Sequence, residues 1–139
     1  MKARIKWKDG MSFLGESGSG HAVLMDGPPE AGGRNLGPRP MEMLLMGVLG
    51  CTGMDVVSIL KKKRQPLRGL KIRAQAERAE GHPAYFKSIH LEYVVSGDVD
   101  EQALRRAIQL SEERYCSAMA NLRAVTAFSS SFRIEKEDG

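Results

Sequence analysis

Alternating apolar and polar residues at the start of the chain predict short β-strands. Ala3, Ile5 and Trp7 are separated by Lys and Arg, which gives the period of two expected of a strand with one buried face. Asp9-Gly10 is a turn sequence typical of a β-hairpin, and a second glycine-rich break lies at residues 18–20. We therefore expect three short antiparallel strands within the first 27 residues.

A glycine- and proline-rich segment, residues 27–38, comes next, and its composition predicts an irregular loop. A long helix is expected from about Pro40 to Lys63, because proline is well placed in a first helical turn, where its missing N–H has no helical partner. Residues 43–51 are apolar on every side, which is typical of a helix that is buried all round. Three glycines lower the helix propensity, so we expect them to make room for a neighbouring backbone or for a ligand.

Two further alternating patterns, residues 70–77 and 88–95, predict a second set of strands. Apolar residues on one side only favour an antiparallel sheet with its other face in water. A last strand is expected at Ser131–Glu135.

Two helices are expected between these strands. The first follows an acidic cap at Asp98–Asp100 and carries an apolar stripe that continues to Tyr115. The second, shorter helix is expected from about Ser117 to Val125. The resulting order, βββ-α-ββ-α-α-β, predicts an α+β fold with helices on one face of an antiparallel sheet.

Length and charge narrow the possible functions. A chain of 139 residues can form one domain with its own core, and we expect a single domain over residues 1–139. The net charge of +4 is spread among acidic residues, and the densest basic run, residues 61–64, follows the long helix, where cations complement the helix dipole. No aromatic residue accompanies this run, which argues against nucleic acid as the main partner.

The distribution of apolar residues along the chain also bears on its cellular location. No hydrophobic leader follows Met1, and Glu42 and Asp55 interrupt the long helix. Its continuous apolar part is about ten residues, short of the ~20 that a bilayer requires. We therefore expect no membrane partner and a cytoplasmic location, in which cysteines are reduced at rest.

Two cysteines, Cys51 and Cys116, are the candidates for chemistry. The three histidines and two cysteines fit no metal-binding spacing, and nucleotide-binding and serine-hydrolase motifs are absent from the sequence. Burial raises the pKa of a thiol, so a cysteine in an apolar helix is inert unless a cation or hydrogen-bond donors stabilise its thiolate. The pair is either two unrelated buried thiols or a redox couple.

Glu42 is a third candidate, because it lies on the same apolar half-helix, nine residues before Cys51. A buried carboxylate needs a partner, and Arg34 or Arg39 of the preceding loop could supply one. An arginine held in this way could also stabilise a Cys51 thiolate.

The run from Pro40 to Cys51, the following Asp55–Leu60, the glycine-rich opening strands and Tyr115-Cys116 together resemble the OsmC/Ohr family. The element order and the 65-residue spacing of the cysteines fit as well, so the resemblance covers essentially the whole chain. It is strongest to the less characterised OsmC-like branch.

The resemblance implies an intertwined homodimer in which antiparallel sheets pack around long central helices, with active sites at the subunit interface. It also implies thiol-dependent hydroperoxide reduction, in which Cys51 attacks the peroxide and Cys116 resolves the sulfenic acid as a disulfide. An external dithiol would then reduce the disulfide, without a metal, haem or other cofactor. Methionine-rich surroundings would suit an organic hydroperoxide.

This chain departs from the family's peroxidases at three positions. Met41 stands where they have a glutamate, so Glu42 points about 100° away around the helix. Their N-terminal arginine has no counterpart in residues 15–21, and Ser117 replaces the proline of their Cys-Pro motif. An alternative is therefore a protein that binds a small hydrophobic or electrophilic molecule in the same cavity, and a third is a structural role for the dimer.

Overall fold

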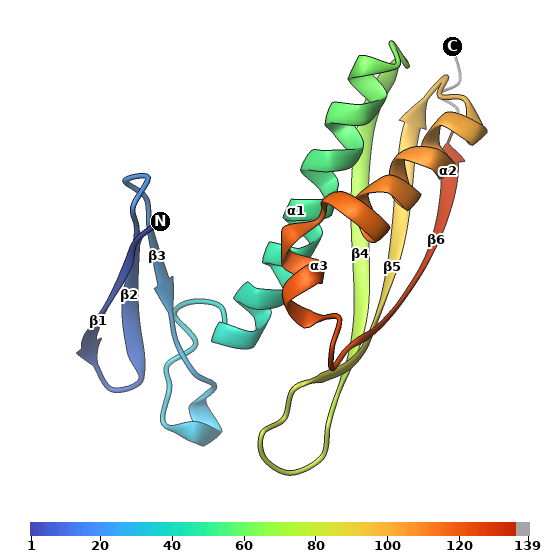
Figure 1. The fold of residues 1–139 in the computed structure, drawn as a ribbon. Coiled ribbons are helices and arrows are strands. Elements are labelled where there is room, and N and C mark those ends of the chain that lie inside the picture. The colour runs from blue at the N-terminus through green and yellow to red at the C-terminus, as the bar shows by residue number, and fades with distance from the viewer. Residues whose placement is uncertain (136–139) are drawn as a thin grey trace. The chain divides into compact units, whose positions relative to one another are not determined.

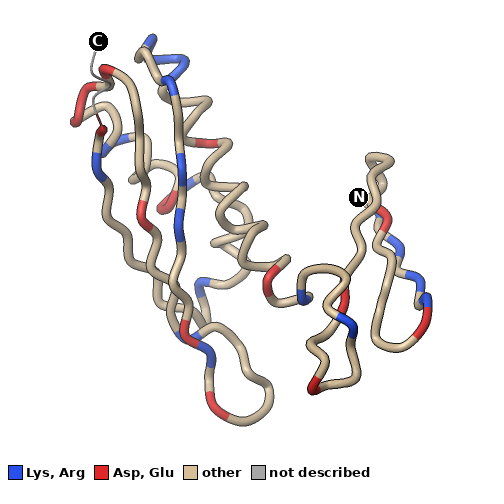
Figure 2. The backbone as a smooth tube through the Cα atoms, turned by 180° about the vertical axis from the view of Figure 1, so that it is seen from behind, with Lys and Arg blue, Asp and Glu red and all other residues tan. Residues whose placement is uncertain are grey.

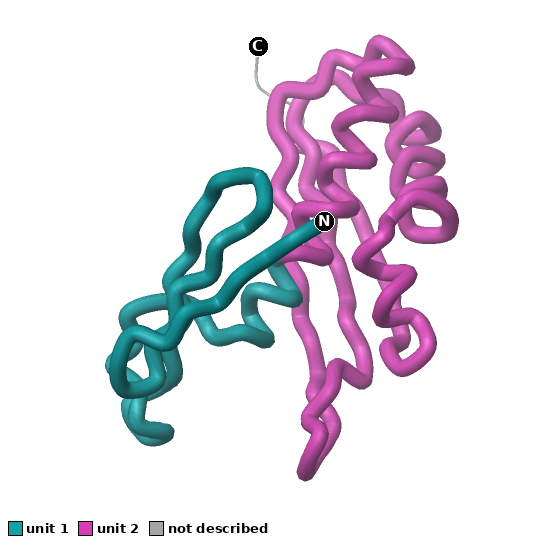
Figure 3. The backbone as a smooth tube through the Cα atoms, turned by 60° about the vertical axis from the view of Figure 1, so that its left-hand side comes forward, with its two compact units in different colours: residues 1–46 teal, residues 47–139 magenta. Residues whose placement is uncertain are grey.

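A computed structural model describes residues 1–135. The chain divides into two compact units, one of residues 1–46 and one that starts at residue 47 (Figures 1 and 3). Each unit contains one three-stranded sheet. The α+β class is confirmed, whereas the single domain expected over residues 1–139 stays a prediction.

The sheet of the first unit consists of the three predicted antiparallel strands, β1 (Ala3–Asp9), β2 (Ser12–Ser17) and β3 (Ala22–Met25). The expected burial of the apolar face of β1 is wrong for this chain. The exposed fraction is 56% for Ile5 and 63% for Trp7, because the other elements of the unit leave this face open. Exposed apolar patches of this kind are common at interaction sites of proteins.

Asp26 organises the segment that follows β3. Its buried carboxylate accepts three backbone N–H groups, those of Gly27 (2.7 Å), Arg34 (3.2 Å) and Leu36 (3.2 Å). Burial acts to raise the pKa of Asp26, but these hydrogen bonds and the charge of Arg34 outweigh it, so the pKa lies below its ordinary value. The loop predicted here also contains one turn of 3-10 helix, η1 (Pro29–Ala31), to which proline is suited in the first turn.

The long helix, α1 (Pro40–Lys62), ends within one residue of its predicted bound. Its buried residues recur every fourth position, which places them on one face of the helix: Val48, Thr52, Val56 and Leu60. Within the single chain, residues 43–51 are not buried on every side, since Met46 is 49% exposed, and Met54 beyond them is 77% exposed. Within residues 1–135, the buried side of α1 is therefore the one that carries Val48 and Leu60.

α1 is also the one described helix that is long and apolar enough to cross a membrane, with a mean hydropathy of 1.9 over its best window. A helix that forms the core of a water-soluble protein meets the same criterion.

The sheet of the second unit has the order β4 (Leu67–Arg78), β5 (Phe86–Gly97) and β6 (Ala127–Glu135). β4 and β5 are antiparallel and contain the two predicted strands, residues 70–77 and 88–95. The expected antiparallel pairing is wrong for β6, which runs parallel to β5. The helical connection between them returns the chain to the end of the sheet at which β5 begins, as parallel pairing requires.

That connection consists of α2 (Glu101–Leu110), a single π-helical turn η2 (Ser111–Tyr115) and α3 (Ser117–Leu122). The predicted acidic cap is confirmed, because the carboxylate of Asp100 accepts the N–H of Ala103 at 3.0 Å. The helices cover one face of the sheet (Figure 1), and several basic residues lie along β4 (Figure 2). This arrangement confirms the predicted one-sided packing of the sheet.

Replacement of Asp26 by Asn is expected to lower the urea concentration at the unfolding midpoint, because the amide binds the three N–H groups less strongly than a carboxylate. A carboxyl whose pKa is lowered on folding stabilises the protein above its unfolded-state pKa, and this contribution is lost as pH falls through the folded-state pKa. The difference between wild type and Asp26→Asn should therefore shrink as pH falls from about 5 toward 2.

Glu30→Gln, a change at an exposed carboxylate of the same segment, serves as the control and should leave the midpoint unchanged. A difference for Asp26→Asn that is constant across this pH range would contradict the assignment.

Candidate functional site

The two cysteines lie together in the second unit. The thiol of Cys116 forms a hydrogen bond with that of Cys51 and also interacts with it electrostatically. Both thiols are free, and they differ in exposure: Cys51 is partly buried on α1, whereas Cys116 is 3% exposed. Two free thiols in direct contact can exchange electrons as a pair without a large rearrangement.

Burial is the main influence on Cys116. It raises the pKa of Cys116 to about 11, the N–H groups of Met119 and Ala118 oppose the increase, and the Cys51 thiol adds to it. At neutral pH Cys116 is therefore a protonated thiol and not a nucleophilic thiolate.

A π-helical turn positions Cys116. The N–H of Cys116 donates to the carbonyl of Ser111 at 2.8 Å, which closes the turn η2 directly before the cysteine. The wider turn also moves Tyr115 off the apolar face of α2, so Tyr115 is 54% exposed and does not continue the predicted stripe. Turns of this type are rare and occur frequently at functional sites.

A chain of buried hydroxyl groups lies beside the thiols. Thr52 Oγ1 is 2.9 Å from Tyr93 Oη and 2.7 Å from Ser111 Oγ. Ser111 donates to Asp55 Oδ2 at 2.9 Å, and Tyr93 donates to Glu112 Oε2 at 2.7 Å. Burial raises the pKa of Tyr93 above its ordinary value, an effect that the contact with the Thr52 hydroxyl opposes and Glu112 increases.

Sequence reasoning missed this hydroxyl cluster, although one signal pointed to it. Thr52 and Asp55 are polar residues within the apolar run of α1, and both lie on the side that the rest of the unit covers. Buried polar groups require hydrogen-bond partners. The sequence itself contains no indication of which distant residues supply them.

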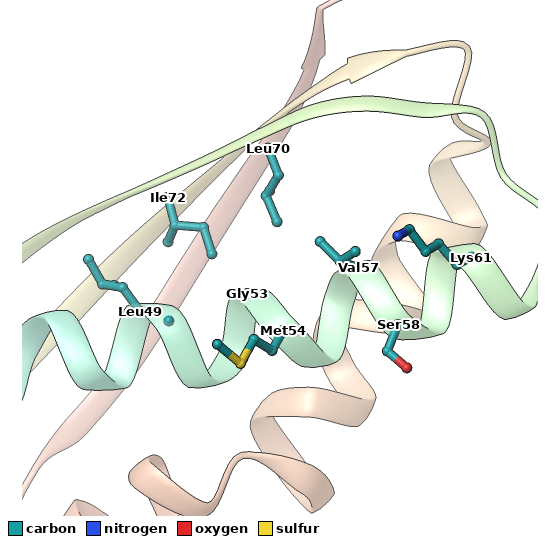
Figure 4. Close-up of a pocket in the computed structure, with 9 residues that line it drawn as sticks. Leu49, Gly53, Met54, Val57, Ser58, Lys61, Leu70 and Ile72 are labelled. Atoms are coloured by element: carbon teal, nitrogen blue, oxygen red, sulfur yellow. The ribbon is translucent and has the colours of Figure 1, made fainter. Parts of the chain in front are cut away.

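An apolar groove of about 740 Å³ lies between α1 and β4 (Figure 4). Leu49 and Met54 of α1 and Ile72 of β4 line it, together with Gly50, which precedes Cys51 in the sequence. Among the described residues no atom lies within 4 Å of a Cβ built on Gly50, whereas one built on Gly53 would lie 3.3 Å from Cδ1 of Ile72. Gly50 therefore leaves open space in the wall of the groove, and Gly53 allows β4 to approach α1.

Glu42, the third predicted site residue, lies in the first unit and is exposed, which contradicts its expected burial. Its Oε1 accepts the N–H of Arg39 at 2.8 Å, a hydrogen bond that caps the start of α1. Arg34 pairs with Asp9, and the Arg39 guanidinium binds Asn35 Oδ1 at 2.7 Å. The expected ion pair of Glu42 with an arginine is therefore absent within residues 1–46, and activation of Cys51 by any of these residues stays a prediction.

A metal site is not evident in the described part of the chain. Residues 1–135 contain no group of three or more His, Cys, Asp or Glu side chains that could hold a metal ion.

Comparison with known proteins identifies relatives over nearly the full chain. Residues 32–131 match the family model described as OsmC-like protein. Protein YhfA of Escherichia coli (strain K12) is 43% identical over 135 residues, which cover 96% of this chain and 98% of YhfA.

Solved structures share the fold. The crystal structure of a hypothetical protein from Aquifex aeolicus VF5 is 34% identical, with a TM-score of 0.87, and the match covers 99% of this chain and 97% of that one. The structure of an organic hydroperoxide resistance protein OsmC from Legionella pneumophila has a TM-score of 0.71 at 15% identity and covers 95% of this chain and 96% of that one.

Alkylation of the native protein should reveal the environment of Cys116. Modification of Cys116 by iodoacetamide, mapped by mass spectrometry, is expected to follow a titration curve with a midpoint near pH 11. In Cys51→Ser the midpoint should fall but stay above the ordinary value of 9.0, since burial is the largest cause of the increase. Half-modification of Cys116 at or below pH 9 would contradict the buried, protonated thiol.

Proposed function

Since this chain belongs to the OsmC-like family, we propose that it reduces organic hydroperoxides with a redox pair formed by Cys51 and Cys116. The observation that carries the proposal is the hydrogen bond between the two thiols. The fold shared with the organic hydroperoxide resistance protein from Legionella pneumophila supports the same reaction class.

The proposed reaction has three steps. The Cys51 thiolate attacks one peroxide oxygen, the O–O bond breaks, and one proton is taken up, which yields an alcohol and Cys51 sulfenic acid. The Cys116 thiol then displaces the hydroxyl of the sulfenic acid, so a disulfide forms and water leaves. A dithiol finally reduces the disulfide and is itself oxidised to a disulfide. No metal or organic cofactor takes part in this scheme.

The division of roles follows from the surroundings of the two thiols. Cys51 is partly exposed, so a peroxide can reach it more readily than it can reach the buried Cys116. Cys116 is buried and its pKa is raised, so it is a poor first nucleophile at neutral pH. Cys116 is suited to react with a sulfenic acid that forms in contact with it.

The groove supports an organic substrate in preference to hydrogen peroxide. Its walls are mainly aliphatic and methionine side chains, with Ser58 and Lys61 at the same groove, and the apolar part would bury the alkyl or aryl part of a hydroperoxide. We propose a cytoplasmic site of action with a small or protein dithiol as reductant, because reducing conditions keep both cysteines free between turnovers.

We further propose that the active form is a homodimer. Large apolar side chains are exposed in both units: Ile5 and Trp7 on β1, and Met46 and Met54 on α1. Apolar surface of this extent is unusual for a monomer and typical of an interface. A second copy of this chain would cover these surfaces and would place the thiol pair close to the interface.

The groove also favours a second function, the binding of a small hydrophobic or electrophilic molecule without efficient turnover. Its volume of about 740 Å³ lies within the range of small-molecule sites. The two functions differ in one respect, because only the reductase requires that Cys51 and Cys116 form a disulfide during turnover.

Serine substitutions test the order of the two thiols. Cys51→Ser should reduce consumption of cumene hydroperoxide to the uncatalysed rate, because no nucleophile remains in contact with the peroxide. Cys116→Ser should support one turnover and then accumulate Cys51 sulfenic acid, which dimedone traps and mass spectrometry detects. Multiple turnovers by Cys51→Ser with dithiothreitol as reductant would rule out the assigned nucleophile.

The proposed dimer is tested at α1. Met54→Lys should weaken self-association about tenfold or more, because it places a charge on a surface that becomes apolar interface. The measurement is molar mass by light scattering across a dilution series. Gln75→Lys, an exposed position on the open polar face of the second sheet, is the matched control and should leave the mass unchanged. A wild-type chain that is monomeric at all concentrations would contradict the dimer.

A further inference from the structure

We propose that the hydrogen bond between Thr52 and Ser111 sets the effective concentration of the Cys116 thiol at Cys51. Thr52 and Ser111 are then positioning residues for disulfide formation. This inference rests on the proposed function, since it concerns the step in which the two thiols become a disulfide. It assigns a role to a part of the molecule that neither attacks the peroxide nor binds the reductant.

The link between the two cysteines is short and continuous. Thr52 follows Cys51 directly on α1, and its Oγ1 lies 2.7 Å from Ser111 Oγ. Ser111 in turn accepts the backbone N–H of Cys116 at 2.8 Å. The peptide bond, the hydroxyl contact and the backbone hydrogen bond thus connect the main chains of both cysteines.

A second contact strengthens the attachment of η2 to α1. Ser111 donates its hydroxyl hydrogen to Asp55 Oδ2 at 2.9 Å, and Asp55 lies three residues after Thr52, on the same side of the helix. Ser111 therefore meets α1 at two positions. Thr52 and Ser111 have no exposed surface, so water does not compete for these hydrogen bonds.

The number of hydroxyl hydrogens determines how the link responds to substitution. Ser111 donates to Asp55 and Tyr93 donates to Glu112, because carboxylate oxygens only accept. Thr52 then has a single hydrogen for two neighbours, Tyr93 and Ser111. Without the Tyr93 hydroxyl, the hydroxyl hydrogen of Thr52 has Ser111 as its remaining partner. Without the Thr52 hydroxyl, the hydrogen bond between Thr52 and Ser111 is lost.

Two substitutions of similar size therefore have opposite consequences. Thr52→Val preserves shape and leaves Ser111 and Tyr93 with their carboxylate acceptors, so no buried donor loses its only partner. Tyr93→Phe removes an equally buried hydroxyl from the same cluster but preserves the contact between Thr52 and Ser111. A comparison of these two variants therefore separates a positioning role of Thr52 from a general contribution of the hydroxyl cluster to stability.

The experiment measures the equilibrium of the reduced protein with glutathione disulfide. Oxidation of both thiols forms the Cys51–Cys116 bond and reduces one glutathione disulfide to two glutathione molecules, and the equilibrium constant gives the effective concentration of the thiol pair. Thr52→Val is expected to lower this concentration about tenfold, the effect of one lost buried hydrogen bond. Tyr93→Phe should leave it unchanged or raise it, and Thr52→Ser, which retains the hydroxyl, should restore it.

Two further variants complete the test. Ser111→Ala removes both contacts with α1 and should lower the effective concentration at least as much as Thr52→Val does. In a Cys116→Ser background, Thr52→Val should leave the rate of Cys51 sulfenic acid formation unchanged, because that step does not involve Cys116.

The outcomes separate the inference from the proposed function. Equal effective concentrations in wild type and Thr52→Val, or equal losses in Thr52→Val and Tyr93→Phe, would overturn the positioning role while the redox pair stands. A wild-type protein that forms no Cys51–Cys116 disulfide with glutathione disulfide would overturn both.

Discussion

The contact between α1 and the π-helical turn η2 is the constraint on which the thiol site depends. Cys51 lies on α1 and Cys116 follows η2, and the hydrogen bond between Thr52 and Ser111 joins the two elements in the interior. Because the hydroxyl groups are buried, each needs a protein partner, and this requirement selects one arrangement of η2 on α1. The same arrangement brings the two thiols into hydrogen-bonding contact.

The different surroundings of the two thiols explain how one pair can perform two chemical steps. A cysteine that attacks a peroxide must be reachable, whereas one that resolves a sulfenic acid must be adjacent and protected from solvent. Cys51 is partly exposed and Cys116 is buried with its pKa raised, so burial is the main difference between them. The exposed apolar side chains of β1 and α1 are consistent with a site that is completed when two chains associate.

Periodic patterns predicted most of the fold, because they report the local environment of each residue. The alternation along β4 and β5, the length of α1 and the cap at Asp100 are of this kind. The parallel pairing of β6, the π turn and the partners of Thr52 depend on contacts between distant residues, which no local pattern encodes. The proximity of Cys51 and Cys116 came from the family resemblance, and the burial of Glu42 was wrong because its carboxylate caps an exposed helix start.

The most direct test of the account is the mass of the intact reduced protein after one equivalent of cumene hydroperoxide. The account predicts a rapid loss of two hydrogen atoms, mapped by peptide analysis to a Cys51–Cys116 disulfide and reversed by a dithiol. The contact between the two thiols makes this product accessible without unfolding. An unchanged mass, or oxidation that leaves Cys116 unmodified and unpaired, would contradict the reductase and favour the binding of a small molecule in the apolar groove.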